Sequence, residues 1–163
     1  MFTKPNTLTE GNYLTRANVL APQLKELREA VRRIRRFIPP PDSEPDRYEV
    51  NHDWTLETPL DKAIALLPAE LTLGWREPGI WKFRRVGWHK DETAKPGEET
   101  VLVLLRGGGT LEVREPDGSV STHRISRIAP LAIFDDTLRH RFIANKGAIC
   151  QALIFHRPRR EES

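Results

Sequence analysis

The chain has 163 residues, 38% of them hydrophobic and 30% charged, with ten glycines, thirteen prolines and a single cysteine. This length is enough for one domain with its own core and too short for two. No apolar run approaches the roughly eighteen residues of a membrane-spanning helix, and one cysteine excludes both an internal disulfide framework and a multi-cysteine zinc site. Residues 1–10 also lack the apolar run of a secretory signal, so we expect a soluble, cytoplasmic protein without a membrane partner. The formal net charge of +3 is mild, so we do not expect a nucleic acid as partner.

The N-terminal segment, residues 1–69, is predicted to be mainly helical. From Pro22 onward, apolar residues recur at spacings of three and four, as on one face of a helix: Leu24, Leu27, Val31, Ile34 and Ile38. The arginines on the remaining surface of this helix are expected to be solvated: Arg28, Arg32, Arg35 and Arg36. A Pro-rich linker over 39–45 follows, and a second short helix fits 60–67.

After Glu70 the pattern changes to short strands separated by turn residues. The strands are predicted at 71–75, 80–89, 100–105, 110–115, 119–125, 130–135, 139–145 and 148–156. Turns are predicted at 77–79, 96–97, 107–109, 117–118 and 146–147, where Asp117-Gly118 is the strongest hairpin signal. Strands without helices between them indicate an antiparallel sandwich or barrel. We expect this barrel to cover 70–157 and a charged tail to cover 158–163.

Two histidines and a carboxylate are the most informative residues of the barrel. His89 and Asp91 lie two residues apart at the end of a predicted strand, so both side chains should point to the same face. His140 begins the seventh predicted strand. Two imidazoles and one carboxylate form the facial triad that holds Fe(II) in non-haem oxygenases and leaves coordination positions open. We therefore interpret His89, Asp91 and His140 as metal ligands and catalytic residues.

The order of motifs around these residues resembles the small Fe(II)/2-oxoglutarate-dependent oxygenases of the prolyl-hydroxylase kind. The resemblance covers His89-Lys90-Asp91, the strand 100–105, the Gly-Gly-x-Leu-x-Val motif at 108–113, the Asp117-Gly118 hairpin, the strand ending at Phe134, and His140. Residues 133–145 are also similar to the distal-histidine segment of aspartyl/asparaginyl hydroxylase-like proteins. The resemblance implies a mainly β fold, a double-stranded β-helix (jelly-roll, cupin-like barrel) with an N-terminal helical buttress.

The same resemblance implies a function. An enzyme of this kind binds Fe(II), uses 2-oxoglutarate and dioxygen, and hydroxylates a C–H bond of a small-molecule or peptidyl substrate. Its relatives carry a cation about ten residues after the distal histidine to pair with the far carboxylate of 2-oxoglutarate. This chain has Ala148-Ile149-Cys150-Gln151 there. Some oxygenases of the asparaginyl-hydroxylase and JmjC kind instead take a lysine from the strand after His-x-Asp, so the resemblance makes Arg106, which lies there, the first candidate for that role. Arg85, which has the same strand parity as His89, is the second candidate.

Cupins offer a competing resemblance. In that reading the ligands are His89, Glu98 or Glu99, and His140, and the protein is a metal-dependent enzyme or small-molecule sensor that does not use 2-oxoglutarate. A barrel that binds a ligand or partner without metal chemistry is the non-enzymatic alternative. The cupin pattern is incomplete, because Asp91 stands where the second histidine of the first pair is expected.

The other polar residues are assigned structural roles. His52, His123 and His156 are interpreted as ordinary polar positions, and Asp135-Asp136 as turn or supporting residues before His140. Cys150 lies in an apolar strand and should be a small buried hydrophobe. The three glycines at 107–109 lack the Gly-Lys-Ser/Thr ending of a phosphate-binding loop, so a tight turn is expected.

Overall fold

The computed structural model describes residues 24–29, 32, 48–51 (backbone only), 64–91 and 94–159. Residues 24–29 and 64–65 are helical. The named elements are β1 (Tyr48–Asn51), α3 (Ala69–Thr72), β2 (Arg76–Phe83), β3 (Arg85–His89), β4 (Glu98–Arg106), β5 (Gly109–Arg114), β6 (Val120–Ile125), β7 (Leu131–Phe134), β8 (His140–Ala144) and β9 (Cys150–Pro158). No helix among the described residues is both long and apolar enough to cross a membrane.

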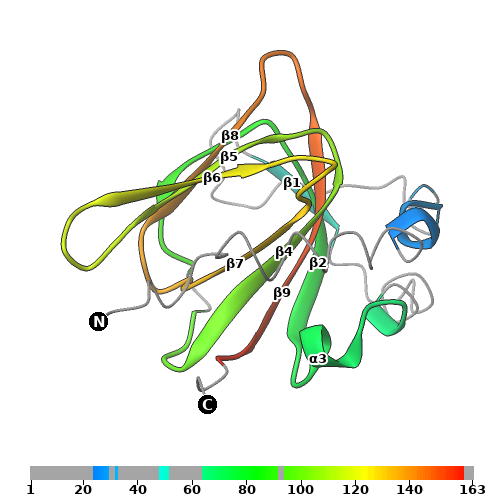
Figure 1. The fold of residues 1–163 in the computed structure, drawn as a ribbon, viewed down its shortest axis with the longest axis horizontal. Helices are drawn as coiled ribbons and strands as arrows, with labels where there is room; N and C mark the ends of the chain where they lie inside the picture. The colour runs from blue at the N-terminus through cyan, green and yellow to red at the C-terminus, as the bar shows by residue number, and fades with distance from the viewer. Residues whose placement is uncertain (1–23, 30–31, 33–47, 52–63, 92–93, 160–163) are drawn as a thin grey trace.

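The strands form two antiparallel sheets. One sheet has the order β1-β2-β9-β4-β7 and the other β3-β8-β5-β6. Strands that are consecutive in the chain therefore often lie in different sheets, and the two sheets face each other around a shared interior (Figure 1). This is the jelly-roll, cupin-like barrel that the sequence predicts.

The five-stranded sheet is apolar on both faces, and β4 shows why. Its side chains alternate, so that Val101, Val103 and Leu105 pack in one cluster while Leu102 and Leu104 pack in the other. The second cluster fills the barrel interior. The first lies on the outer face of the sheet together with Leu24, Leu27, Ile64, Leu67 and Leu71.

The helical segments therefore cover the outer face of the five-stranded sheet. Residues 24–29 and α3 lie on the same side of the molecule, beside β2 (Figure 1). Phe155 of β9 is completely buried in this outer cluster, and burial of a side chain of this size stabilises the fold by about 1.5–3 kcal/mol. The predicted helical buttress is thus present where the chain is described; residues 30–31, 33–47 and 52–63, including the Pro-rich linker, lie outside the described residues.

Most predicted strands are confirmed, with differences near the start of the barrel. The predicted strand at 71–75 is wrong: α3 ends at Thr72, and Gly74 has a φ of +76°. The predicted strand at 80–89 is two strands, β2 and β3, which belong to different sheets. A strand that the sequence did not predict, β1, pairs with β2.

The turn residues behave as predicted at most positions. Gly97, Gly107, Gly118 and Gly147 all have positive φ between strands. Residues 77–79 are the exception, because they lie inside β2 at a register shift against β9, where Glu77 has a φ of +48°. A bulge therefore replaces the predicted turn.

Two arginines at the C-terminal end of the described chain, one in β9 and one directly after it, contact other parts of the barrel. Arg157 is buried, its guanidinium donates to Glu99 Oε1 at 2.9 Å, and it also donates to the carbonyl oxygen of Leu71 at 2.9 Å. Arg159 lies 2.8 Å from Asp135 Oδ2. These contacts tie the end of β9 to β4, to α3 and to the segment before β8.

Candidate metal centre

Three side chains converge at one end of the barrel interior. Nε2 of His89 and Nε2 of His140 each lie 3.3 Å from Oδ1 of Asp91. The three ligand atoms lie within 4.8 Å of one another, and the two imidazole rings have centroids 4.3 Å apart. The residues that the sequence singled out as metal ligands are therefore brought together.

The strand pairing places these residues. His89 ends β3 and His140 begins β8, and the two are direct partners in the ladder. The ring of Phe134, at the end of β7 in the other sheet, packs edge-on against His140 with centroids 4.8 Å apart. His140 is 6% exposed and His89 33% exposed, so the cluster has a buried side and a side open to solvent.

The outer nitrogen of each ring is held by the backbone. Nδ1 of His89 lies 2.7 Å from the carbonyl oxygen of Gly87, and Nδ1 of His140 lies 2.9 Å from that of Leu138. A carbonyl oxygen only accepts hydrogen bonds, so each Nδ1 carries the proton. In the neutral imidazole the lone pair is then on Nε2, which is the tautomer that binds a metal.

This tautomer makes the cluster fit a cation. With Nδ1 protonated, two Nε2 lone pairs face the same carboxylate oxygen, and only a proton or a cation between them makes this contact favourable. Burial by itself raises the pKa of Asp91. When Nε2 of His140 or His89 carries a proton in the metal-free protein, its hydrogen bond to Oδ1 outweighs burial and holds that pKa well below its usual range. Asp91 is therefore ionised at neutral pH, as a metal ligand must be.

A second polar cluster adjoins the first. Thr100 of β4 donates to Oδ2 of Asp136 at 2.9 Å and lies 3.5 Å from Oδ2 of Asp91. His156 of β9 contacts the same Asp136 oxygen through Nδ1 at 2.5 Å. All three of Thr100, Asp136 and His156 are buried, so this hydrogen-bonded network supports the face of Asp91 that is turned away from the histidines.

The network includes a residue that sequence reasoning assigned to another role. His156 was expected to be an ordinary polar position, whereas Asp135 and Asp136 were expected to be turn or supporting residues. Asp135 does form the expected turn contacts with Thr137, whereas Asp136 is completely buried. The alternation of side chains along β9 could have indicated that His156 points inward, because His156 lies on the same face of the strand as Ala152 and Cys150, which pack in the interior cluster.

Asp91, Asp136 and His156 also lie close enough to hold a metal ion. Their donor set fits less well, because Nδ1 of His156 is already directed at Asp136 Oδ2. Oδ1 of Asp136 is buried without a hydrogen-bond partner among the described residues. The first cluster, with two nitrogen lone pairs and one carboxylate aimed at a common point, is the better metal centre.

The two arginines predicted to bind 2-oxoglutarate lie away from the cluster. Arg106 is exposed at the other end of β4, six residues beyond Thr100, which corresponds to about 20 Å along a strand. Arg85 is also exposed. It was predicted to face the same way as His89 because the two residues are four apart, but the pairing of β3 with β8 shifts by one residue between Val86 and His89, so the two side chains do not share a face. The structure does not bring either residue to the metal ligands.

The carboxylates of the cupin interpretation have other partners. Glu98 receives hydrogen bonds from Nε of Arg76 at 2.8 Å to each of its oxygens. Glu99 pairs with the buried Arg157. The carboxylate that lies with His89 and His140 is Asp91, so the structure brings together two histidines and this aspartate rather than two histidines and Glu98 or Glu99.

Comparison with known proteins supports the fold. No family model matches the sequence, and no curated protein matches it. Among solved structures, HygX from Streptomyces hygroscopicus, determined with nickel and 2-oxoglutarate bound, is similar with a TM-score of 0.57 and 13% identity over 84% of this chain and 78% of that chain. A Pseudomonas putida prolyl-4-hydroxylase is similar with a TM-score of 0.50 and 18% identity over 86% and 88%. At these identities the likeness shows the jelly-roll fold alone.

Proposed function

We propose that this chain is a non-haem Fe(II)-dependent dioxygenase that oxidises, by hydroxylation, a C–H bond of a small-molecule or peptidyl substrate. One observation carries the proposal: the Nε2 atoms of His89 and His140 and Oδ1 of Asp91 are directed at a common point at the mouth of a jelly-roll barrel. Two imidazoles and one carboxylate suit Fe(II) and leave coordination positions for other ligands. Bound Fe(II) would supply the activation of dioxygen.

The chain's own residues bind and orient this centre. The carbonyl oxygens of Gly87 and Leu138 keep both Nδ1 atoms protonated and fix the planes of the imidazoles. Thr100 and the Asp136–His156 pair hold the second oxygen of Asp91 on the buried side. The more exposed edge of His89 leaves one side of the centre for substrate.

The finer proposal is that 2-oxoglutarate is the cosubstrate. Its support is the motif order around His89, Asp91 and His140, together with a fold like that of HygX. A second candidate function, a cupin-type metal enzyme that does not use 2-oxoglutarate, is favoured by a specific observation. Cys150, Ala152 and Leu104, which face the interior deeper in the barrel, are apolar. Arg85 and Arg106, the candidate partners of the far carboxylate of 2-oxoglutarate, lie elsewhere. None of these five residues therefore provides a cation for that carboxylate next to the cluster.

A spectroscopic titration separates these candidates. Fe(II) and then 2-oxoglutarate are added to the metal-free protein without oxygen, and the visible charge-transfer band of the chelate is recorded. The proposal predicts the band in the wild type and its loss in Asp91→Ala. Fe(II) binding without the band would contradict 2-oxoglutarate use and support the second candidate, while absence of Fe(II) binding would contradict both.

A further inference from the structure

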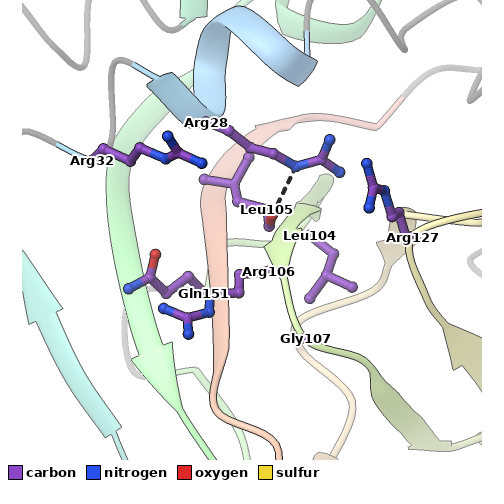
Figure 2. A pocket seen from close by; sticks show the side chains of 8 residues that line it. All are labelled: Arg28, Arg32, Leu104, Leu105, Arg106, Gly107, Arg127 and Gln151. Atoms are coloured by element: carbon purple, nitrogen blue, oxygen red, sulfur yellow. Dashed lines mark hydrogen bonds between the residues drawn. The ribbon is translucent and has the colours of Figure 1, made fainter.

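A cavity lined by arginines lies at the end of β4 opposite the metal cluster. Its volume is about 570 Å³, and Arg28, Arg32, Arg106 and Arg127 line it together with Gln151 and Leu105. The arginines come from the helical segment above, from β4, and from the turn before β7, so they surround the cavity from several sides (Figure 2). We call this the arginine cavity.

The helical segment holds two of these arginines over the cavity. Nε of Arg28 donates to the carbonyl oxygen of Leu105 at 2.8 Å, which directs the rest of its guanidinium over the cavity (Figure 2). The N–H of Arg32 donates to the carbonyl oxygen of Arg28 at 3.0 Å, so the two side chains lie one helical turn apart on the same face. Like charges at this spacing repel each other.

Among the residues that the structure describes, no carboxylate balances the positive charge in the cavity. Figure 2 shows the guanidinium groups of Arg28 and Arg127 turned toward each other. Burial and the charge of Arg127 lower the pKa of Arg28. Within the part of the chain that the structure describes, no carboxylate pairs with any of the four arginines. An anion in the cavity would remove this repulsion.

We propose that the arginine cavity binds a small organic or inorganic dianion, a phosphate ester or a dicarboxylate. Guanidinium groups form paired hydrogen bonds with both kinds of anion. The volume lies within the range of about 300–1,000 Å³ that is typical of small-molecule sites. A small ligand is favoured over a nucleic acid because the arginines surround a concave site and none of the described residues that line it has an aromatic side chain for base stacking.

This site is independent of the proposed oxygenase function. Thr100, which adjoins the metal cluster, and Arg106 are six residues apart on β4, or about 20 Å along the strand. A dianion bound here therefore does not contact the metal ligands, and the dianion site can be tested without any assay of oxidation.

Calorimetric titration at low ionic strength tests the proposal. Sodium pyrophosphate and sodium succinate are titrated separately into the metal-free protein. We expect saturable binding of at least one of them, weakened about tenfold or more in Arg28→Gln and in Arg106→Gln, because each variant removes one charge-assisted contact. Tighter binding of pyrophosphate identifies a phosphate ligand, and tighter binding of succinate a dicarboxylate.

A matched control removes a charge elsewhere. Arg124 is exposed on β6 and does not line the cavity, so Arg124→Gln should keep the wild-type affinity within about twofold. Pyrophosphate binding should also be unchanged in His89→Ala, which excludes chelation of residual metal at the triad. Absence of binding to both anions, equal losses in Arg124→Gln and Arg106→Gln, or tighter binding of a single-stranded oligonucleotide that is lost in Arg106→Gln would overturn the proposal.

Discussion

Thr100 connects the two polar clusters in the barrel interior. Its hydroxyl lies between Oδ2 of Asp136 at 2.9 Å and Oδ2 of Asp91 at 3.5 Å, and it is 1% exposed. Asp91 uses its other oxygen toward the histidines. Residues that hydrogen-bond to a metal ligand fix its orientation and typically change metal affinity about 10- to 100-fold when they are removed. Thr100 is therefore a positioning residue for Asp91.

Replacing Thr100 with valine should weaken metal binding without unfolding the barrel. Valine has nearly the same shape but cannot hydrogen-bond to Asp136 or Asp91. We expect the Kd for Mn(II) to rise about tenfold, while Thr100→Ser, which keeps the hydroxyl, should stay within about twofold of the wild type. Mn(II) affinity can be measured by electron paramagnetic resonance. A wild-type Kd in Thr100→Val would show that the hydroxyl does not position the ligand.

At the scale of single residues, the sequence predicts the cluster of candidate ligands better than the contacts that support it. His89 and Asp91 lie in one local motif and His140 begins a later predicted strand, and all three side chains offer atoms that bind metals. The pairing of His156 with Asp136 was not predicted, because it depends on β9 and the end of β7 lying next to β4. A contact between residues 20 positions apart in the chain follows from the sheet order, which local patterns do not contain.

At the scale of elements, the ends of β2 and β4 are joined by an ion pair. Arg76 contacts both oxygens of Glu98, although these strands are separated by β9 in the sheet. The hydrogen bond from Arg76 holds the pKa of Glu98 below its ordinary value of 4.5, against the opposing effect of burial. The pair links the bulged start of β2 to the strand that carries Thr100.

This pair predicts a specific pH dependence of stability. Because the folded protein binds a proton at Glu98 less readily than the unfolded chain, the stabilisation is complete above the ordinary glutamate pKa and is lost as the pH falls through the lowered folded value. The free energy of unfolding of the metal-free protein should therefore fall more between about pH 6 and pH 3 than that of Glu98→Gln.

Urea denaturation across this pH range measures the difference. Arg76→Gln should show the same weaker pH dependence as Glu98→Gln, and the double variant should add little to either. Parallel curves for the wild type and Glu98→Gln would show that the pair does not contribute.

The predicted strands are correct where segments of alternating side chains are bounded by turn residues such as glycine. The strands β4 to β9 follow the predicted ranges closely, since positive-φ glycines such as Gly118 and Gly147 mark their turns. Residues 71–75 were wrongly predicted to be a strand. Leu71 is buried against the outer face of the sheet, and an apolar residue can be buried in this way from a helix as well as from a strand. The break between β2 and β3 at Arg84 has no glycine or proline to signal it.

At the scale of the whole molecule, the barrel separates two different charged sites. One end holds a cluster whose ligand atoms lie close enough together to hold a cation, and the other holds four arginines that lack described carboxylate partners. The jelly-roll fold and the proximity of His89, Asp91 and His140 were predictable from motif order. The second site was not, because Arg28 and Arg127 are 99 residues apart and are brought together only when the helical segment packs on the sheet.

Titration with Mn(II), followed by electron paramagnetic resonance, decides whether His89, Asp91 and His140 bind one metal ion. We predict a single saturable Mn(II) site in the wild type that is lost in His140→Ala and in Asp91→Ala. It should be retained in His123→Ala, which changes a histidine of β6 outside the cluster. Undiminished Mn(II) binding in His140→Ala and Asp91→Ala, or no Mn(II) binding by the correctly folded wild type, would contradict the account.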